Sequence, residues 1–393
     1  MKIVVLDGYT ENPGDLSWSE LEKLGSVTAY DRTAYSESPL IAERIGDAEI
    51  VVMNKTPISR ETIDKCPNIK LIAVLATGYN VVDYNYAREK GIPVVNVPTY
   101  GTASVSQFSI ALLLEICHHI GHHSESVHAG NWANNADWCY WDYPLIELEG
   151  KTIGIIGFGR IGQAEGRIAK ALGMNVLAYD LFPNDSGREI AEYVGLDELY
   201  ACADVITLHC NLTPENTGMI NKESIAKMKD GVNIINCSRG ELVDNESIIQ
   251  ACESGKVNRY VTDFPATELL NRKNIICTPH LGASTAEAED NCAIMAAKQI
   301  VNFVEKGNIV NSVNYPAVHL DAKGAQRVVV LFKGDESTGE EAQKILAPFK
   351  VVGFVVKTKK AFGAALFNLN VKADESALQK LKGINGVTRV LAL

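Results

Sequence analysis

Arg239, Glu268 and His280 are the residues whose types suit acid–base chemistry on a molecule that carries a carboxylate. Each follows a short apolar run typical of a buried strand. Because parallel strands of one sheet end at the same edge, we expect the three side chains to meet there. A histidine can transfer a proton, a carboxylate can orient and support it, and a guanidinium can hold a substrate carboxylate. Taken singly, each is also an ordinary loop residue.

The stretch Lys151–Asp180 predicts the cofactor that such a site would use. An apolar run stops at the sequence GFGRIG and gives way to a helical period, and a second apolar run ends at Asp180, 18 positions beyond Gly162. Gly157 permits a tight turn, Gly159 lets backbone N–H groups approach a pyrophosphate, and Gly162 allows close helix–strand packing. Strand, glycines, helix and terminal acid together indicate a dinucleotide.

Asp180 also predicts which dinucleotide binds. A carboxylate at this position accepts hydrogen bonds from the adenosine ribose and repels a 2′-phosphate. The next residues, Leu181, Phe182 and Pro183, supply no arginine to neutralise such a phosphate. The sequence therefore predicts NAD and not NADP.

With NAD, the three polar residues suit hydride transfer to or from an alcohol carbon. Glu268 would raise the pKa of His280 by favouring the imidazolium.

Strand-like and helix-like segments alternate along most of the chain, which is typical of parallel α/β domains. The expected class is a doubly wound Rossmann domain plus a flavodoxin-like substrate domain. The predicted boundaries are residues 1–100 with 286–318 for the substrate domain and 101–285 for the NAD-binding domain. Long helices are expected over 103–121 and 285–306. The strands expected to deliver the site residues are Val232–Ile235, Tyr260–Thr262 and Ile275–Cys277.

Residues 319–393 form a third expected domain. Their pattern is strand, helix, strand, strand, helix, strand, which is the ferredoxin-like order. Residues 321–393 hold 12 Lys/Arg and 7 Asp/Glu, a net charge of +5, whereas the chain as a whole carries −11. The contrast marks a boundary, and residues 314–324 are expected to be a linker.

A Thr–Gly pair, Thr77-Gly78, follows the fourth expected strand of the first domain. Loops at the carboxyl ends of parallel strands bind ligands, so this turn could offer backbone N–H groups to a substrate carboxylate. A plain connecting turn is an equally good interpretation from the residues alone. A substrate phosphate would need several basic groups, and this region offers Lys55 and, less directly, Arg60.

Four motifs make the chain resemble the D-isomer-specific 2-hydroxyacid dehydrogenase family over about residues 1–318: the glycine fingerprint with Asp180, NCSRGELVD, TDFPATE and TPHLGAST. The resemblance implies that Arg239 binds the substrate carboxylate and keto oxygen, that Glu268 pairs with His280, and that His280 is the acid–base. It places Thr77 and Gly78 in the substrate loop. The further cofactor contacts that it implies are Arg160, Ile161, Cys210, Cys237, Ser238, Arg239, Asp263, His280, Leu281, Gly282 and Ala283.

The resemblance points to two branches of that family. LATGYNVVD and WCYWDYPLIEL look like the hydroxypyruvate reductase or glycerate dehydrogenase branch, whereas the segment 262–316 looks like short phosphoglycerate dehydrogenases of serine biosynthesis. The C-terminal pattern resembles the ACT regulatory domain of the second branch, which senses an amino acid. Its first loop, Lys333–Ser337, departs from the usual turn. We expect D-glycerate and hydroxypyruvate as the substrate pair, with 3-phosphoglycerate as the alternative.

Composition excludes several other classes. A charge of −11 and a pI near 5.3 argue against nucleic acid or an anionic membrane as partner. No apolar run approaches a membrane span, and the strand-like start without a signal peptide predicts a cytoplasmic protein with reduced cysteines. A different class that stays open is a non-catalytic protein that senses NAD(H), and another is an amino-acid-sensing module with a vestigial enzyme.

Two further segments carry expectations. His118, His119, His122 and His123 have the spacing of a two-histidine metal site, but no glutamate or third ligand accompanies them, so we expect a surface cluster and no metal. The aromatic run 132–143 suits either a wall of the active site or a subunit interface, and it predicts a homodimer or homotetramer.

Overall fold

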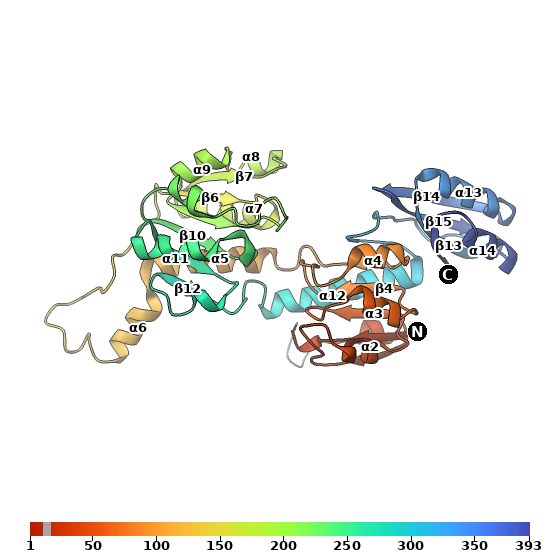
Figure 1. The fold of residues 1–393 in the computed structure, drawn as a ribbon, viewed down its shortest axis with the longest axis horizontal. Helices are drawn as coiled ribbons and strands as arrows, with labels where there is room; N and C mark the ends of the chain where they lie inside the picture. The colour runs from red at the N-terminus through yellow and green to blue at the C-terminus, as the bar shows by residue number, and fades with distance from the viewer. Residues whose placement is uncertain (11–16) are drawn as a thin grey trace. The chain divides into compact units, whose positions relative to one another are not determined.

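The computed structural model describes residues 1–10 and 17–393, and the chain divides into two compact units. One unit is Gly101–Thr285, and the other combines Met1–Tyr100 with Ala286–Leu393. Figure 1 shows the elements of each unit along the chain. Each unit holds its own sheets and core, so the two are described separately.

The unit Gly101–Thr285 is built on a parallel sheet in which the strand order reverses between β6 and β9, as in doubly wound domains. We expected about six strands, and the described sheet has seven because the short, exposed β8 gives no apolar signal. Its spatial order is β12 (Ile275–Cys277), β11 (Val257–Thr262), β10 (Val232–Asn236), β9 (Val205–Leu208), β6 (Thr152–Ile156), β7 (Asn175–Tyr179) and β8 (Glu192–Tyr193).

Helices cover both faces of this sheet, as the alternation of buried side chains along each strand requires. Ile155 packs into a core with α5, while the next residue, Ile156, packs into a second core with α9 and α11. The helices of the unit are α5 (Thr102–His118), α6 (Ile120–His128), α7 (Arg160–Ala171), α8 (Asp185–Arg188), α9 (Leu196–Cys202), α10 (Lys222–Ala226) and α11 (Asn245–Ser254).

The helix expected over 103–121 is shorter than predicted. It ends at His118 because His119 adopts the left-handed conformation with φ 47°, and α6 then begins at Ile120. Within the described chain no single helix is long and apolar enough to cross a membrane. The helices α5 and α6 have that length and composition only when taken together, and they are bent by 54° relative to each other.

The second unit contains a parallel sheet in the order expected of a flavodoxin-like domain, β2-β1-β3-β4-β5. The sequence did not reveal β2, since its side chains are mostly exposed. The strands are β1 (Lys2–Val5), β2 (Ser26–Ala29), β3 (Ile50–Met53), β4 (Leu71–Val74) and β5 (Val94–Val95). The helices are α1 (Ser19–Glu22), α2 (Pro39–Ile45), α3 (Arg60–Lys65), α4 (Tyr84–Glu89) and α12 (Ala286–Lys306).

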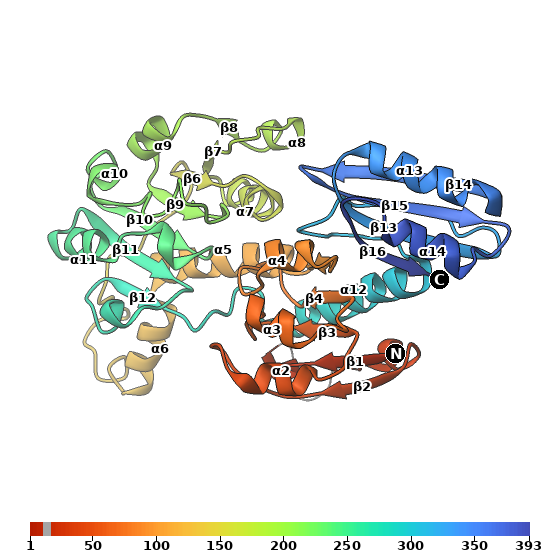
Figure 2. The same cartoon turned by 45° about the vertical axis from the view of Figure 1, so that its right-hand side comes forward.

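A separate antiparallel sheet at the C-terminus confirms the predicted order of four strands and two helices. The sheet order is β14-β15-β13-β16, and α13 and α14 cover one face (Figure 2). The other face contributes Val329, Leu331 and Leu366 to the core that holds β1 and α12. The elements are β13 (Gln326–Lys333), α13 (Glu336–Leu346), β14 (Val351–Lys359), β15 (Phe362–Leu369), α14 (Glu375–Lys382) and β16 (Val387–Ala392).

The segment 314–324, expected to be a linker, is firmly held over its first half. Asn314 is buried, accepts a hydrogen bond from Val94 N at 2.9 Å and donates to Tyr84 O and Ile92 O. Tyr315 is fully buried and donates to Arg88 O at 2.8 Å. The polar residues that suggested a linker thus form hydrogen bonds, and these bonds attach the C-terminal sheet to the parallel sheet.

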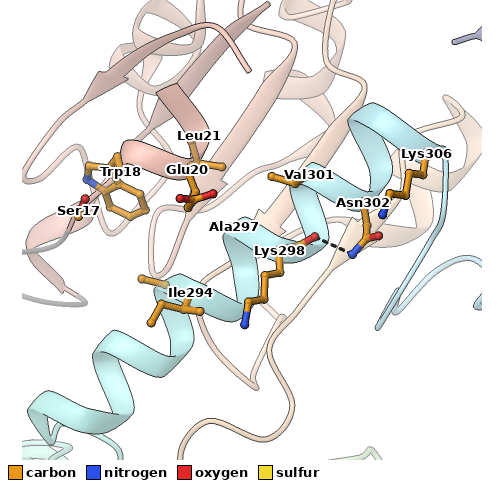
Figure 3. A pocket seen from close by; sticks show the side chains of 11 residues that line it. Ser17, Trp18, Glu20, Leu21, Ile294, Ala297, Lys298, Val301, Asn302 and Lys306 are labelled. Carbon is orange, nitrogen blue, oxygen red and sulfur yellow. Dashed lines mark hydrogen bonds between the residues drawn. The ribbon is translucent and has the colours of Figure 1, made fainter. Parts of the chain in front are cut away.

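A shallow hollow of about 230 Å³ lies between α1 and α12 (Figure 3). Leu21, Ala297 and Val301 form its apolar floor, and Lys298 and Lys306 stand at its rim. None of the residues expected to form the functional site lines this hollow.

Candidate active site

The glycine-rich turn has the geometry that a dinucleotide phosphate requires. Gly157 has φ 92°, and a Cβ there would lie 2.3 Å from Cys210 N. A Cβ on Gly162 would lie 2.4 Å from Gly157 O, whereas a Cβ on Gly159 would meet nothing within 4 Å. Gly159 caps α7 without a side-chain hydrogen bond. The space beside Gly159 is thus open at the start of α7, where the first N–H groups of a helix have no partner within the helix, so the turn has room for a pyrophosphate.

Asp180, the terminal acid of the fingerprint, is held by two backbone N–H groups. Phe158 N donates to Oδ2 and Phe182 N donates to Oδ1, both at 2.8 Å. The first bond ties the acid to the glycine turn itself. This arrangement fixes a negative charge beside the position where the ribose of a bound dinucleotide would lie.

Replacing Asp180 with asparagine should narrow the preference for NADH over NADPH. A like-charge contact at about 4 Å costs about 1–4 kcal/mol near a protein surface. The ratio of kcat/KM with NADH to kcat/KM with NADPH should therefore fall by roughly tenfold or more. Steady-state kinetics with both cofactors would measure it. Asp185→Asn, on the exposed helix α8, is the matched control. Equal use of NADPH and NADH by the unmodified enzyme would contradict the assignment.

Arg239 and His280 both contact one aromatic ring, that of Phe264, at the carboxyl edge of the sheet. The Arg239 guanidinium lies 5.6 Å from the centre of the Phe264 ring, and the His280 ring lies edge-on to it at 4.5 Å. Arg239 Nη1 also donates to Ser238 O at 2.7 Å. The two residues thus share a neighbour, and their joint role in a site stays a prediction. Sequence reasoning missed Phe264, although its place directly after β11 could have indicated it.

The contact of His280 with the Asp263 backbone indicates which ring nitrogen carries a proton. Its Nδ1 lies 3.3 Å from Asp263 O, and because a carbonyl oxygen only accepts hydrogen bonds, Nδ1 must carry a proton. In the neutral ring Nε2 is then the nitrogen that carries the lone pair. His280 has φ 59°, an uncommon conformation for a residue other than glycine and one that occurs at functional sites.

Asp263 braces the segment that carries His280. The resemblance implied that Asp263 contacts the cofactor, but its carboxylate is buried and engaged on both oxygens. Oδ1 accepts from Leu281 N and the Thr278 hydroxyl, both at 2.8 Å, and Oδ2 accepts from Gly282 N at 2.9 Å. Its observed contacts therefore fix the conformation of residues 278–282, including that of His280.

Glu268 does not pair with His280 in this structure, contrary to expectation. Its Oε1 accepts a hydrogen bond from Asn245 Nδ2 at 2.9 Å, and this bond lowers the pKa of the exposed carboxyl. Asp263 Oδ2 lies 3.7 Å from His280 Nδ1. Catalytic hydrogen bonds commonly form only with ligand bound, so a pairing of Glu268 with His280 in the complex stays a prediction.

The remaining expected cofactor contacts form a mixed surface around this edge. Ser238 donates to Cys210 O at 2.5 Å, and burial raises the pKa of Cys210 to about 11 and raises that of Cys237. Both cysteines are therefore neutral thiols at physiological pH. None of the nine cysteines, all of which lie in the described residues, forms a disulfide. Arg160 and Leu281 are exposed, Ile161 and Ala283 are partly exposed, and Gly282 is buried.

In the second unit, the predicted substrate residues lie in loops at the carboxyl ends of β3 and β4. The buried Asp7 holds the first loop, because its carboxylate accepts from the N–H groups of Asn54, Lys55 and Thr56 at 2.7–2.8 Å. The second loop contains Gly78 and is fixed through Thr77, whose hydroxyl donates to Val97 O at 3.0 Å. The role of Asp7 could not be predicted from the sequence, since an acid after a strand can serve in many ways.

The histidine cluster holds the aromatic segment that follows it. His122 Nε2 lies 2.7 Å from Asp142 Oδ2, and Asp142 N donates to His123 Nε2. His119 and His122 also pack against the Tyr143 ring. Because α5 ends at His118, the four histidines do not share one helix face. In the described residues no group of three or more potential ligands is arranged to hold a metal ion.

Comparison with known proteins places the site in a family. Residues 110–282 match the model of the D-isomer specific 2-hydroxyacid dehydrogenase NAD-binding domain. A hydroxypyruvate reductase of Blautia hydrogenotrophica is 57% identical over 322 residues, which cover 80% of this chain and 100% of that protein. A D-3-phosphoglycerate dehydrogenase of Archaeoglobus fulgidus is 38% identical over 330 residues, 81% of this chain and 60% of that protein.

A similar fold is known with its ligands bound. The D-lactate dehydrogenase of Aquifex aeolicus, solved with NAD and lactic acid, has a TM-score of 0.68 and 28% identity, covering 81% of this chain and all of that one. The chain belongs to the D-isomer-specific 2-hydroxyacid dehydrogenase family. It is an NAD-dependent oxidoreductase, which confirms the cofactor expected from Asp180 and the glycine turn.

Proposed function

We propose that this enzyme reduces hydroxypyruvate to D-glycerate with NADH. The observation that carries the proposal is the 57% identity to a hydroxypyruvate reductase over that protein's full length. NADH supplies the hydride that is added to the keto carbon. His280 Nε2 gives the proton to the developing alkoxide, and the Arg239 guanidinium holds the substrate carboxylate and keto oxygen. Backbone N–H groups of Thr77 and Gly78 bind the carboxylate as well.

The basic residues of the second unit support an unphosphorylated substrate. Lys55 is exposed in the loop that Asp7 organises. The Arg60 guanidinium lies over the Tyr86 ring at 4.2 Å, so it is already used in packing α3 against α4. A phosphate group is usually bound by several charge-assisted hydrogen bonds, so the packing of Arg60 on Tyr86 weighs against a phosphate at this loop.

The reaction is tested directly by its product. The purified full-length enzyme, incubated with hydroxypyruvate and NADH, should consume the two in equal amounts and yield D-glycerate, identified by chiral chromatography. Formation of L-glycerate, or no oxidation of NADH, would contradict the proposal. The second outcome would favour a protein that senses NAD(H) without turnover.

The alternative substrate is 3-phosphoglycerate, and the C-terminal domain is the observation that favours it. Its strand order and paired helices are those expected of an ACT-like domain, and we propose that it has this fold and binds an amino-acid effector. The 57% identical hydroxypyruvate reductase covers only four fifths of this chain, so about a fifth has no counterpart there. A change in thermal unfolding temperature on adding serine would support the effector.

Glu268→Gln should leave an active enzyme whose reduction of the keto acid is lost at lower pH than in the unmodified enzyme. Reduction requires a protonated His280, and an ionised Glu268 beside it favours the imidazolium and so raises the histidine pKa. Removing the charge lowers that pKa, and the acid form disappears earlier as pH rises. The measurement is the pH profile of kcat/KM. Glu246→Gln, on the exposed face of α11, should leave the profile unchanged.

We also propose that the aromatic segment 132–143 forms a subunit interface. Trp138 is 85% exposed and Trp141 65% exposed, and the segment extends from α6 as an irregular chain (Figure 1). Exposed indole rings grouped this closely are typical of interaction sites. Sedimentation velocity at micromolar concentration should show at least a dimer. Trp138→Ser with Trp141→Ser should shift the distribution toward monomer, whereas Tyr35→Ser, also exposed, should not; a monomeric unmodified enzyme would contradict the proposal.

A further inference from the structure

A buried charged cluster lies behind the glycine turn, and neither the proposed proton transfer nor the fingerprint explains it. Glu165 is in α7, six residues beyond Gly159, and its side chain is 1% exposed. Its Oε1 accepts from the Ser109 hydroxyl at 2.5 Å, and Oε2 accepts from the Thr207 hydroxyl at 2.6 Å. His209 Nε2 lies 2.8 Å from Oε2, and its side chain is 2% exposed.

This cluster is costly to bury unless every hydrogen-bonding group is satisfied. Burial raises the pKa of Glu165, but the attraction and hydrogen bond of His209, with the two hydroxyls, outweigh it, and the pKa is lowered overall. Glu165 is therefore a carboxylate at neutral pH. The nearby ionisable groups are His209, the neutral Cys237 thiol and Asp263.

The cluster is connected through the backbone to the glycine turn at Gly157 and to the loop that carries Ser238 and Arg239. His209 N donates to Ile156 O, and the peptide between His209 and Cys210 lies where a Cβ on Gly157 would clash, 2.3 Å from Cys210 N. Cys210 O in turn accepts the Ser238 hydroxyl at 2.5 Å, next to Arg239. A shift of the His209 side chain would therefore move the peptide on which the first glycine of the phosphate turn rests.

We propose that Glu165 is a positioning residue for the dinucleotide: through His209 it holds the 209–210 peptide against Gly157 and under Ser238. The carboxylate fixes the imidazole, the imidazole fixes the peptide, and the peptide sets the close approach of strand β9 to the glycine turn. The inference rests on NAD as the cofactor and is independent of which keto acid is reduced.

The test is the dissociation constant of NADH, measured by fluorescence titration of the purified full-length enzyme. Glu165→Gln keeps the shape of the side chain and removes its charge, and it should raise the NADH dissociation constant by roughly threefold to tenfold, since a hydrogen bond to a charged group is stronger than one to a neutral group. KM for the keto acid, measured at saturating NADH, should change less than twofold.

Milder variants keep the proposal falsifiable if Glu165→Gln fails to fold. Thr207→Val and Ser109→Ala each remove one hydroxyl from the carboxylate and should weaken NADH binding in the same direction. Ser106→Ala is the matched control, because this buried hydroxyl donates only to Ala103 O among the contacts observed in α5. The proposal is wrong if every variant that folds binds NADH within twofold of the unmodified enzyme's dissociation constant while its unfolding temperature falls. In that case the cluster only stabilises the fold. Because binding and not turnover is measured, the result stands even if hydroxypyruvate is not the substrate.

Discussion

Replacing His280 with alanine should lower kcat for keto acid reduction by roughly 10²–10⁴-fold, the loss typical of removing a positioned proton-transfer group. The expectation rests on geometry: Asp263 O fixes the proton on Nδ1, and Phe264 and the braced segment 278–282 hold the ring, so Nε2 is the nitrogen that we propose exchanges the proton. NADH affinity should change little, since the glycine turn and Asp180 are separate from this ring.

The control for this variant is His319→Ala, which removes an exposed histidine from the other unit. It should leave kcat unchanged. A His280→Ala enzyme with near-normal kcat would refute the assignment and direct attention to another base on the same edge of the sheet. Measuring NADH affinity alongside kcat separates a loss of chemistry from a loss of cofactor.

Arg239→Ala should raise KM for the keto acid and lower kcat together. The guanidinium contacts the substrate in both the ground state and the transition state, so its removal weakens binding and loosens orientation. Truncating one partner of a charge-assisted pair typically costs about 2–5 kcal/mol, which corresponds to a fall in kcat/KM of roughly 30-fold to several thousand-fold.

Arg239→Lys distinguishes charge from geometry. Lysine keeps the positive charge but lacks the planar fork, so this variant should recover only part of the lost kcat/KM. Arg167→Ala, an exposed arginine of α7, is the surface control and should behave as the unmodified enzyme. An Arg239→Ala variant whose KM is unchanged would show that another group binds the substrate carboxylate.

Much of the fold follows from local patterns in the sequence. The alternation of apolar strands and helical segments predicted both parallel sheets, because buried parallel strands have continuous apolar runs. The fingerprint predicted β6, α7 and β7 together, since Gly157 and Gly162 are dictated by steric contacts that admit no side chain. The antiparallel C-terminal sheet was predicted from the order of strand-like and helix-like segments alone.

The parts that the sequence did not predict depend on contacts between distant residues. The brace formed by Asp263, the loop organised by Asp7 and the buried pair of Glu165 and His209 join residues that are far apart in the chain. The break at His119 has no glycine or proline to indicate it. The apparent linker is likewise buried through Asn314 and other polar residues whose partners only the folded chain defines.

The comparison of hydroxypyruvate with 3-phosphohydroxypyruvate, both with NADH and the full-length enzyme, tests the central claim most directly. Steady-state kinetics should give a higher kcat/KM for hydroxypyruvate, because the 57% identical relative is a hydroxypyruvate reductase and the Arg60 guanidinium is already packed on the Tyr86 ring. A higher kcat/KM for 3-phosphohydroxypyruvate would contradict the account and assign the enzyme to phosphoglycerate oxidation.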